Sequence, residues 1–236
     1  MLKSNVKKLI SVMLILVMLM SMAACSAQTS SEAKPAEEPK ATEEPKASGK
    51  IDEIKAKGKI VLGTAADYPY EFHKEIDGKD NIVGFDIEIA KAIAADIGVE
   101  LEIKDMKFDG LLAALVAEDI DFIIAGMVAT EERKQSVDFS IPYYEAEQKF
   151  LVKVENADKV KTADNLKGKA MGAQKSTIQE EIANTKIEAS EVKALSKITD
   201  LVLELQNDKI FGIVLASPVA FAYSKQNPAF AVPEIS

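Results

Sequence analysis

Apolar and polar positions follow two different spacings over residues 51–125, and these spacings predict alternating strands and helices. Short apolar runs rich in β-branched residues predict buried strands over residues 59–63, 99–103 and 121–125. Longer segments with apolar positions three and four apart predict helices over residues 51–58, 85–97 and 110–118. Gly98 predicts the end of the longest helix, whose expected inward face holds Phe85, Ile89, Ile93 and Ile97. Between the first strand and that helix, the D-G and G-K-D-N sequences within residues 76–84 predict a hairpin turn.

The alternation starts afresh after residue 147. Period-two spacing predicts a strand over 148–154, and further strands are expected over 169–173, 188–194 and 211–216. Helices are expected from Thr177 onward, over 199–207 with Leu201, Val202 and Leu205 inward, and over 218–225. This order predicts an α/β protein with mostly parallel sheets that carry helices on both faces. Two such units predict two lobes, over residues 51–146 and 147–236, with a ligand cleft between them.

The segment 125–133, A-G-M-V-A-T-E-E-R, directly follows the third predicted strand. Thr130 is expected to cap a helix whose first turn contains two glutamates. A strand, a Gly-containing loop and a helix start place free backbone N–H groups where α/β proteins hold small anions. Arg133 can reach back over the loop and match a carboxylate with two parallel hydrogen bonds. The segment indicates either a carboxylate receptor or a surface arginine paired with Glu or Asp.

Residues 1–24 have the three parts of a signal peptide. Lys3, Lys7 and Lys8 precede an apolar run over residues 9–20, which is shorter than the roughly 20 residues that a spanning helix needs. Cys25, the single cysteine, follows two alanines and resembles the lipobox cysteine of bacterial lipoproteins. The resemblance implies a lipid attached to Cys25 and an extracytoplasmic, membrane-anchored protein. A plain secretory signal with an unpaired thiol is the alternative.

Residues 25–50 contain E-E-P-K units, three prolines and almost no apolar side chain that could be buried. Such a segment cannot repay the entropy of ordering. Proline and charge favour extended conformations. We expect a disordered tether that holds the folded part away from the membrane.

Composition excludes several classes of function. The net charge of −9 argues against a nucleic-acid partner, because phosphates attract a basic face. Trp is absent, so an aromatic platform for sugars is not expected. One histidine, His73 in a polar turn segment, and one cysteine leave no set of metal ligands and no Ser-His-Asp group. The sequence therefore predicts no catalytic residue, no metal and no cofactor.

Eight motifs in order make the chain resemble the solute-binding proteins of ABC importers, specifically the polar amino-acid class, family 3. They include G-T-A-A-D-Y-P, V-G-F-D-I-E-I-A-K and E-R-K-Q-S-V-D-F-S, and lie at residues 63–69, 83–91, 109–115, 123–127, 132–140, 142–144, 166–169 and 174–180. The likeness covers essentially everything from Lys59 to the end. It implies a two-lobed, type II periplasmic-binding-protein-like fold. It also implies capture of an amino acid or similar small carboxylate for delivery to an ABC permease.

The resemblance assigns roles to individual residues. Arg133 matches the arginine that clamps the ligand's α-carboxylate. Thr177, next to Ser176, matches the helix N-terminus that donates N–H groups to the same carboxylate. Tyr68 and Phe108 match the aromatic walls around the ligand side chain, with ordinary packing as the alternative.

Two further positions match the family and two depart from it. Gly126 matches a position that offers backbone hydrogen bonds, and Asp67 matches one that more often structures its loop. Val128 stands where the family usually has Ser or Thr to receive the ligand's ammonium, and Ala216 stands where it usually has Asp or Glu. An unpaired buried ammonium is costly. The ammonium therefore finds another partner, such as the Tyr68 ring, or the ligand lacks one, or binding is weakened.

The family's return strand and the end of its first lobe have no counterpart before Ser236. We expect a truncated gene product or partial sequence with one hinge strand rather than two; a naturally minimal variant is the alternative. The leading functional hypothesis is a binding protein that closes over a small zwitterion. An enzyme on the same scaffold, of the dehydratase kind, and a ligand-sensing module are the competing hypotheses.

Overall fold

The computed structural model describes residues 49–235. The predicted signal peptide, Cys25 and the tether up to residue 48 lie outside the described residues. Along the described part, none of the helices combines the length and the apolar character needed to cross a bilayer.

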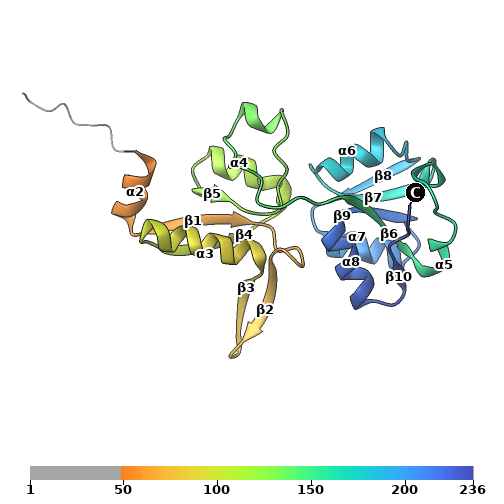
Figure 1. Cartoon of the computed structure of the whole chain (residues 1–236), viewed down its shortest axis with the longest axis horizontal. Helices are drawn as coiled ribbons and strands as arrows, with labels where there is room; N and C mark the ends of the chain where they lie inside the picture. The colour runs from red at the N-terminus through yellow and green to blue at the C-terminus, as the bar shows by residue number, and fades with distance from the viewer. Residues whose placement is uncertain (1–48, 236) are drawn as a thin grey trace, which may run out of the picture. The chain divides into compact units, whose positions relative to one another are not determined.

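Three parallel strands form the first sheet, in the order β4-β1-β5 (Figure 1). Their bounds are β1 (Lys59–Thr64), β4 (Glu100–Asp105) and β5 (Phe122–Ile123). β1 pairs with β4 along its whole length but with β5 only through Leu62 and Gly63. Because the strands are parallel, their carboxyl ends meet at one edge, where the loops after Thr64 and Ile123 begin.

Helices cover both faces of this sheet. The elements are α2 (Lys50–Lys57), α3 (Phe85–Ile97), η1 (Phe108–Gly110) and α4 (Leu111–Val116). Leu62 packs against Ile87 of α3, whereas the neighbouring Val61 packs in a cluster with Leu111 of α4. Successive side chains of a strand point to opposite faces, so α3 and α4 lie on opposite sides of β1.

A hairpin stands between β1 and α3. Its strands are β2 (Phe72–Ile76) and β3 (Lys79–Val83), paired antiparallel. Asp77 and Gly78 form the turn with φ of 52° and 74°. Two central residues with positive φ are typical of a type I′ turn, so the turn predicted from D-G is confirmed.

The second sheet has five strands in the order β10-β6-β9-β7-β8. Their bounds are β6 (Gln148–Lys153), β7 (Ala170–Gln174), β8 (Glu191–Leu195), β9 (Gly212–Ala216) and β10 (Phe230–Ala231). β7 pairs in parallel with β8 and β9, while β6 runs antiparallel to both β9 and β10. The expected mostly parallel sheet is therefore present in its β8-β7-β9 part.

Helices also cover both faces of the second sheet. They are α6 (Ile178–Thr185), α7 (Ile198–Gln206) and α8 (Ser217–Gln226), with the short α5 (Val154–Ala157) and η3 (Ala163–Leu166) between β6 and β7. Leu151 packs with Leu201 of α7 and Val219 of α8, whereas Phe150 packs with Ala183 of α6. The inward face predicted for α7 is confirmed, because Leu201, Val202 and Leu205 are all buried.

Three expectations need correction. The helix expected from Thr130 is only a single turn, η2 (Arg133–Gln135). The third strand, expected over 121–125, is reduced to the two residues of β5. Phe85 is 46% exposed, because α3 instead turns Ile87, Ala90 and Ala94 fully inward.

Candidate binding site

Arg133 lies at the start of η2, in the loop that leaves the first sheet. Its backbone N–H donates to the Thr130 hydroxyl over 3.3 Å, so Thr130 caps this single turn. The half-buried guanidinium donates to the Val128 carbonyl over 2.6 Å and to the Ser176 carbonyl over 2.8 Å. Val128 belongs to the same loop, but Ser176 follows β7 of the second sheet. Arg133 therefore contacts both halves of the described chain and uses two of its five N–H donors in doing so.

Phe108 forms the floor beneath this guanidinium. Its ring centroid lies 5.6 Å from the central carbon of Arg133, a cation–π distance. The ring is buried in a cluster with Leu111 and Ile120. Tyr68 is 36% exposed and packs edge-on against Phe72, with ring centroids 4.8 Å apart. The two predicted aromatic walls thus have different partners, and only Phe108 contacts Arg133.

Thr177 is the N-cap of α6, as predicted. Its hydroxyl accepts from the Glu180 N–H over 3.3 Å and donates to the Gln174 carbonyl over 2.6 Å. The first N–H groups of a helix have no partner inside it, so this end is a source of donors. Ser176, with φ of 62°, is different, because its N–H already donates to the Glu180 carboxylate over 2.7 Å. The prediction that this turn offers N–H groups therefore applies to Thr177 and not to Ser176.

Gly126 follows β5 in the left-handed region, with φ of 56°. Its N–H donates to an Asp86 carboxylate oxygen over 2.9 Å and lies 3.1 Å from the Tyr143 hydroxyl. The N–H of Gly126 is thus already used in hydrogen bonds within the protein. Asp86 and Tyr143 were not among the predicted site residues.

Two more contacts join residues around the site across the two sheets. The Gln174 amide donates to the Asp67 carboxylate over 2.6 Å, and Lys175 forms an ion pair of 3.2 Å with Asp109. Burial raises the pKa of Asp67 to about 6, although the Gln174 hydrogen bond favours the charged form. The role in structuring its own loop, which was expected for Asp67, thus did not include this contact with the second sheet. Burial also lowers the pKa of Arg133.

Of the two departures from the family pattern, Val128 lies in the Arg133 loop and Ala216 lies at the end of a strand. Val128 is 43% exposed, and its carbonyl accepts from Arg133. Ala216 ends β9 and provides the N-cap of α8 without a side-chain hydrogen bond. Neither side chain can accept from an ammonium group.

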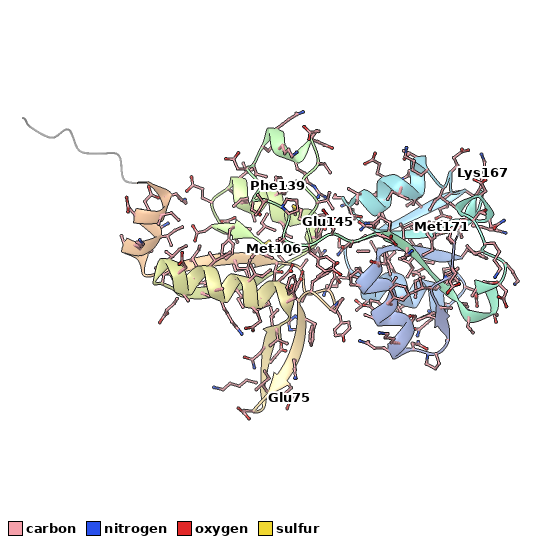
Figure 2. All side chains as sticks on the ribbon, viewed as in Figure 1. Glu75, Met106, Phe139, Glu145, Lys167 and Met171 are labelled. Carbon is pink, nitrogen blue, oxygen red and sulfur yellow. The ribbon has the colours of Figure 1, made fainter. Side chains whose placement is uncertain are left out.

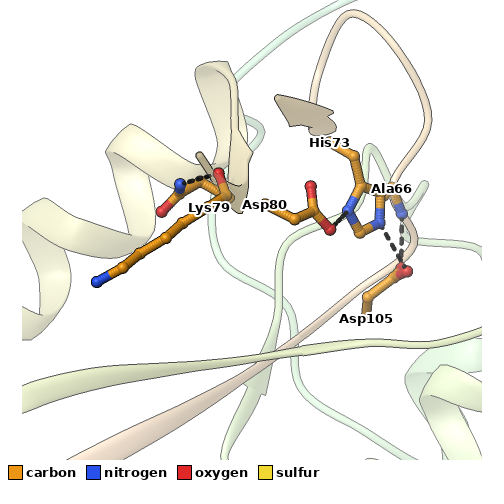
Figure 3. A network of polar contacts seen from close by, with 6 residues as sticks. Ala66, His73, Lys79, Asp80 and Asp105 are labelled. Carbon is orange, nitrogen blue, oxygen red and sulfur yellow. Dashed lines mark hydrogen bonds and ion pairs between the residues drawn. The ribbon is translucent and has the colours of Figure 1, made fainter. Parts of the chain in front are cut away.

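His73 lies on β2, in a polar network with residues of β3 and β4 (Figure 3). Its ring nitrogens lie 2.8 Å from Asp80 and 3.2 Å from Asp105, whose second oxygen accepts from the Ala66 N–H over 3.0 Å. These hydrogen bonds, first to Asp105 and then to Asp80, raise the pKa of the half-exposed His73. Within residues 49–235, no group of His, Cys, Asp and Glu has the arrangement of a metal site.

A separate hollow of about 250 Å³ opens in the second sheet region. It is lined by Lys153, Asn156, Ala170, Leu205, Asp208, Lys209, Ile210 and Phe211. None of the predicted site residues lines it. No arginine lines this hollow, whereas Arg133 offers the planar fork that binds a carboxylate by two parallel hydrogen bonds.

The family of the chain follows from a match over most of its length. The family model described as bacterial extracellular solute-binding proteins, family 3, matches residues 60–230. The chain belongs to this family. Its α/β architecture is that of the two-lobed, type II periplasmic-binding-protein-like proteins, so the fold class predicted from the sequence is confirmed.

Several relatives are named as amino-acid-binding proteins. The arginine-binding extracellular protein ArtP of Bacillus subtilis (strain 168) is 38% identical over 184 residues, which cover 75% of this chain and 70% of ArtP. A probable histidine-binding protein of Campylobacter jejuni is 37% identical over 71% of this chain and 63% of its own length. The crystal structure of an amino acid ABC transporter substrate-binding protein from Streptococcus pneumoniae Canada MDR_19A, bound to L-arginine, superposes with a TM-score of 0.76. It is 40% identical and covers 79% of this chain and 78% of that protein.

Proposed function

We propose that the protein is an extracytoplasmic lipoprotein that captures an amino acid between its two lobes and delivers it to an ABC permease. The observation that supports this most directly is the position of Arg133. Its guanidinium lies on the Phe108 ring and reaches the carbonyl of Ser176, the residue before the α6 N-cap. A carboxylate at this point would receive guanidinium donors from one lobe and the Thr177 N–H from the other.

L-Arginine is the first ligand to test. ArtP and the Streptococcus pneumoniae protein are, by name, an arginine-binding protein and a protein bound to L-arginine. The carboxylates of Asp67 and Asp109 lie on loops of the first lobe and contact Gln174 and Lys175 of the second. Acidic groups near the site suit a ligand with a cationic side chain.

We assign binding rather than catalysis to this site. General acid–base catalysis needs a titratable group within hydrogen-bond reach of the reacting atoms. Asp67, the carboxyl group at the site with a pKa of about 6, accepts from the Gln174 amide, and the single histidine is held by Asp80 of the hairpin and Asp105 of β4. Two relatives are also named as amino-acid-binding proteins, and the Streptococcus pneumoniae structure is that of an ABC transporter substrate-binding protein.

Calorimetric titration of the full chain with L-arginine tests the proposal. Arg133→Ala should weaken L-arginine at least about a hundredfold, because two charge-assisted hydrogen bonds are lost. Arg133→Lys should recover only part of the affinity, since an ammonium cannot form the two-pronged contact. Lys134→Ala is the matched control, because exposed Lys134 pairs with the neighbouring Glu131 and with no other residue of 49–235. Equal affinities of the Arg133→Ala variant and the unmodified protein would remove the carboxylate clamp.

A ligand series separates carboxylate recognition from general attraction of cations. Agmatine, which is L-arginine without its carboxylate, should not bind measurably if Arg133 carries the interaction. If agmatine and L-arginine bind equally, the proposed role of Arg133 is wrong.

The lipid anchor has its own test. A fatty-acid analogue fed to expressing cells should label the unmodified protein and not the Cys25→Ala variant.

A further inference from the structure

Two carboxyl groups, those of Glu71 and Asp86, lie buried against each other beside the loop that carries Arg133. Glu71 is 2% exposed and Asp86 is 0% exposed. Glu71 belongs to the loop between β1 and β2, and Asp86 is the second residue of α3. The two carboxyl groups are close enough for one to donate a hydrogen bond to the other if it carries a proton. Two ionised carboxylates cannot make such a contact, because each has only acceptors.

Asp86 already behaves as an ionised acceptor. One of its oxygens accepts from the Gly126 N–H over 2.9 Å and from the Tyr143 hydroxyl over 3.0 Å. Its other oxygen, Oδ1, is buried and receives no donor from residues 49–235, and the same holds for Oε2 of Glu71. A buried acceptor without a donor is costly. One proton between the two carboxyl groups would remove this cost.

The neighbours of Glu71 also point to a proton on this residue. Thr64 contacts Glu71, but the Thr64 hydroxyl donates its single proton to the Ile124 carbonyl over 2.7 Å. The ionisable groups that face Glu71 are Asp86, Asp67, Tyr70 and Tyr143, and all of them are acidic. Burial, followed by the charges of Asp86 and Asp67, raises the pKa of Glu71 to about 10. Glu71 is therefore the proton carrier at neutral pH.

The groups that donate to Asp86, Gly126 and Tyr143, belong to segments next to the binding site. Gly126 lies two residues before Val128, whose carbonyl receives the guanidinium of Arg133. Tyr143 lies in the extended segment that connects η2 to β6, and its ring packs against Phe85 of α3. One carboxylate thus fixes the Arg133 loop and the crossover between the sheets.

We propose that Glu71 stays protonated at neutral pH and donates a hydrogen bond to Asp86, which in turn positions Gly126 and Tyr143 to hold the Arg133 loop. Glu71 and Asp86 are positioning residues in this proposal and do not touch the ligand. Its functional part rests on the proposed role of Arg133 as the carboxylate receptor. Its structural part, a shared proton that orders the loop, is independent of any ligand.

Urea unfolding between pH 5 and pH 9 tests the proton. The unfolded chain releases the Glu71 proton near the ordinary glutamate pKa of about 4.3, whereas the folded chain retains it. The folding equilibrium constant of the unmodified protein should therefore fall up to tenfold per pH unit relative to Glu71→Gln, whose amide donates at every pH. Glu75→Gln is the matched control, because exposed Glu75 lies near the hairpin turn (Figure 2). Parallel curves for the unmodified protein and Glu71→Gln would overturn the shared proton.

Amide exchange at Gly126, followed by NMR at pH 7, tests the positioning without ligand. Tyr143→Phe, which removes a donor to Asp86 and an acceptor of the Gly126 N–H but preserves the ring, should raise the exchange rate of the Gly126 N–H at least tenfold. Glu71→Gln should leave that rate near the value of the unmodified protein, and Glu71→Ala should raise it. Equal rates in Tyr143→Phe and the unmodified protein would overturn the positioning, even if Glu71→Ala does not fold.

Calorimetry with L-arginine then addresses the functional part. Tyr143→Phe should weaken L-arginine severalfold, and Glu71→Gln should not. If the unmodified protein does not bind L-arginine, the proposed function fails for this ligand, while the pH curves and the Gly126 exchange still decide the inference. If the protein binds L-arginine and Tyr143→Phe binds it equally well, the link between Asp86 and the site is wrong.

Discussion

At the scale of single residues, the site is determined by contacts that join distant parts of the sequence. Arg133 contacts Phe108 and Ser176, which lie 25 and 43 positions away in the sequence. Asp67 contacts Gln174, 107 positions away. Both residues belong to recognisable motifs, so their presence near a site could be predicted. Their partners could not, because side-chain pairing across two sheets has no local signature.

The acidic group of Asp67 predicts a pH dependence of stability. Its pKa rises from 3.8 to about 6 on burial, so its contribution to the free energy of unfolding is fully present below pH 3.8 and is lost as the pH rises through 6. The loss amounts to up to about 3 kcal/mol. Asp67→Asn keeps an acceptor for Gln174 but does not titrate. Unfolding in urea at pH 4 and pH 7 should therefore show a larger loss in the unmodified protein than in Asp67→Asn, which keeps the pH dependence contributed by Glu71.

Asp77→Asn is the control for this experiment, because Asp77 is an exposed residue of the hairpin turn. It should retain the full pH dependence. A pH dependence of Asp67→Asn equal to that of the unmodified protein would contradict the burial argument.

The side chains of Val128 and Ala216 determine whether the α-ammonium group of a ligand finds hydrogen-bond acceptors. Neither side chain can accept a hydrogen bond, so an α-ammonium near them loses its partners. Val128→Thr and Ala216→Asp together should tighten L-arginine about tenfold or more, since a hydrogen bond to a charged group contributes about 1.5–3 kcal/mol. Titration calorimetry of the double variant measures this. Unchanged affinity would mean that the ammonium is held elsewhere. Val116→Thr, at an exposed position of α4, is the matched control.

At the scale of elements, the sequence correctly predicts the helices that bury an apolar face. It predicts too great a length for the helices that do not. The helix α7 was predicted with its inward residues, because Leu201, Val202 and Leu205 repeat at helical spacing and pack on β7 and β9. The helix after Thr130 has an N-cap and acidic residues but no apolar stripe beyond it. Capping starts a turn, whereas packing of an apolar face supplies most of the stability of a helix. The cap therefore produced only η2.

The same comparison explains why an α-helix, α6, follows Thr177, whereas only the single turn η2 follows Thr130. Both begin with a threonine whose hydroxyl accepts a backbone N–H. α6 also buries Ala183 and packs Ile182 against the core of the second sheet. The expected helix 110–118 contracts to α4 for a related reason, since Val116 is 63% exposed.

The cap of α6 gives an element-scale prediction. Thr177→Ala should lower the free energy of unfolding by about 1 kcal/mol, because the Glu180 N–H loses its acceptor. Thr185→Ala is the control, since exposed Thr185 donates only to a carbonyl in the last turn of the same helix. Chemical unfolding of both variants measures the difference. If both lose equal stability, Thr177 does not cap the helix.

At the scale of the whole described chain, polar contacts connect segments at the edge of the first sheet to segments at the edge of the second. They include Arg133 with Ser176, Asp67 with Gln174, and Lys175 with Asp109. The division into lobes at residues 146 and 147 stays a prediction, but these contacts place the candidate site where both sheets contribute. A ligand bound there must interact with segments far apart in the sequence.

Hydrogen exchange followed by mass spectrometry tests this last point. If L-arginine binds to Arg133 and to the N-terminus of α6, it should protect peptides from two separate regions, around residues 122–135 and around residues 174–181. Protection arises because bound ligand adds its binding free energy to every opening that breaks the site, about 2.7 kcal/mol when the ligand is present at 100 times its dissociation constant. A ligand held by one lobe alone would protect one region and leave the other unchanged. Arg133→Ala at the same L-arginine concentration should show protection in neither, because the guanidinium is the contact that both regions share.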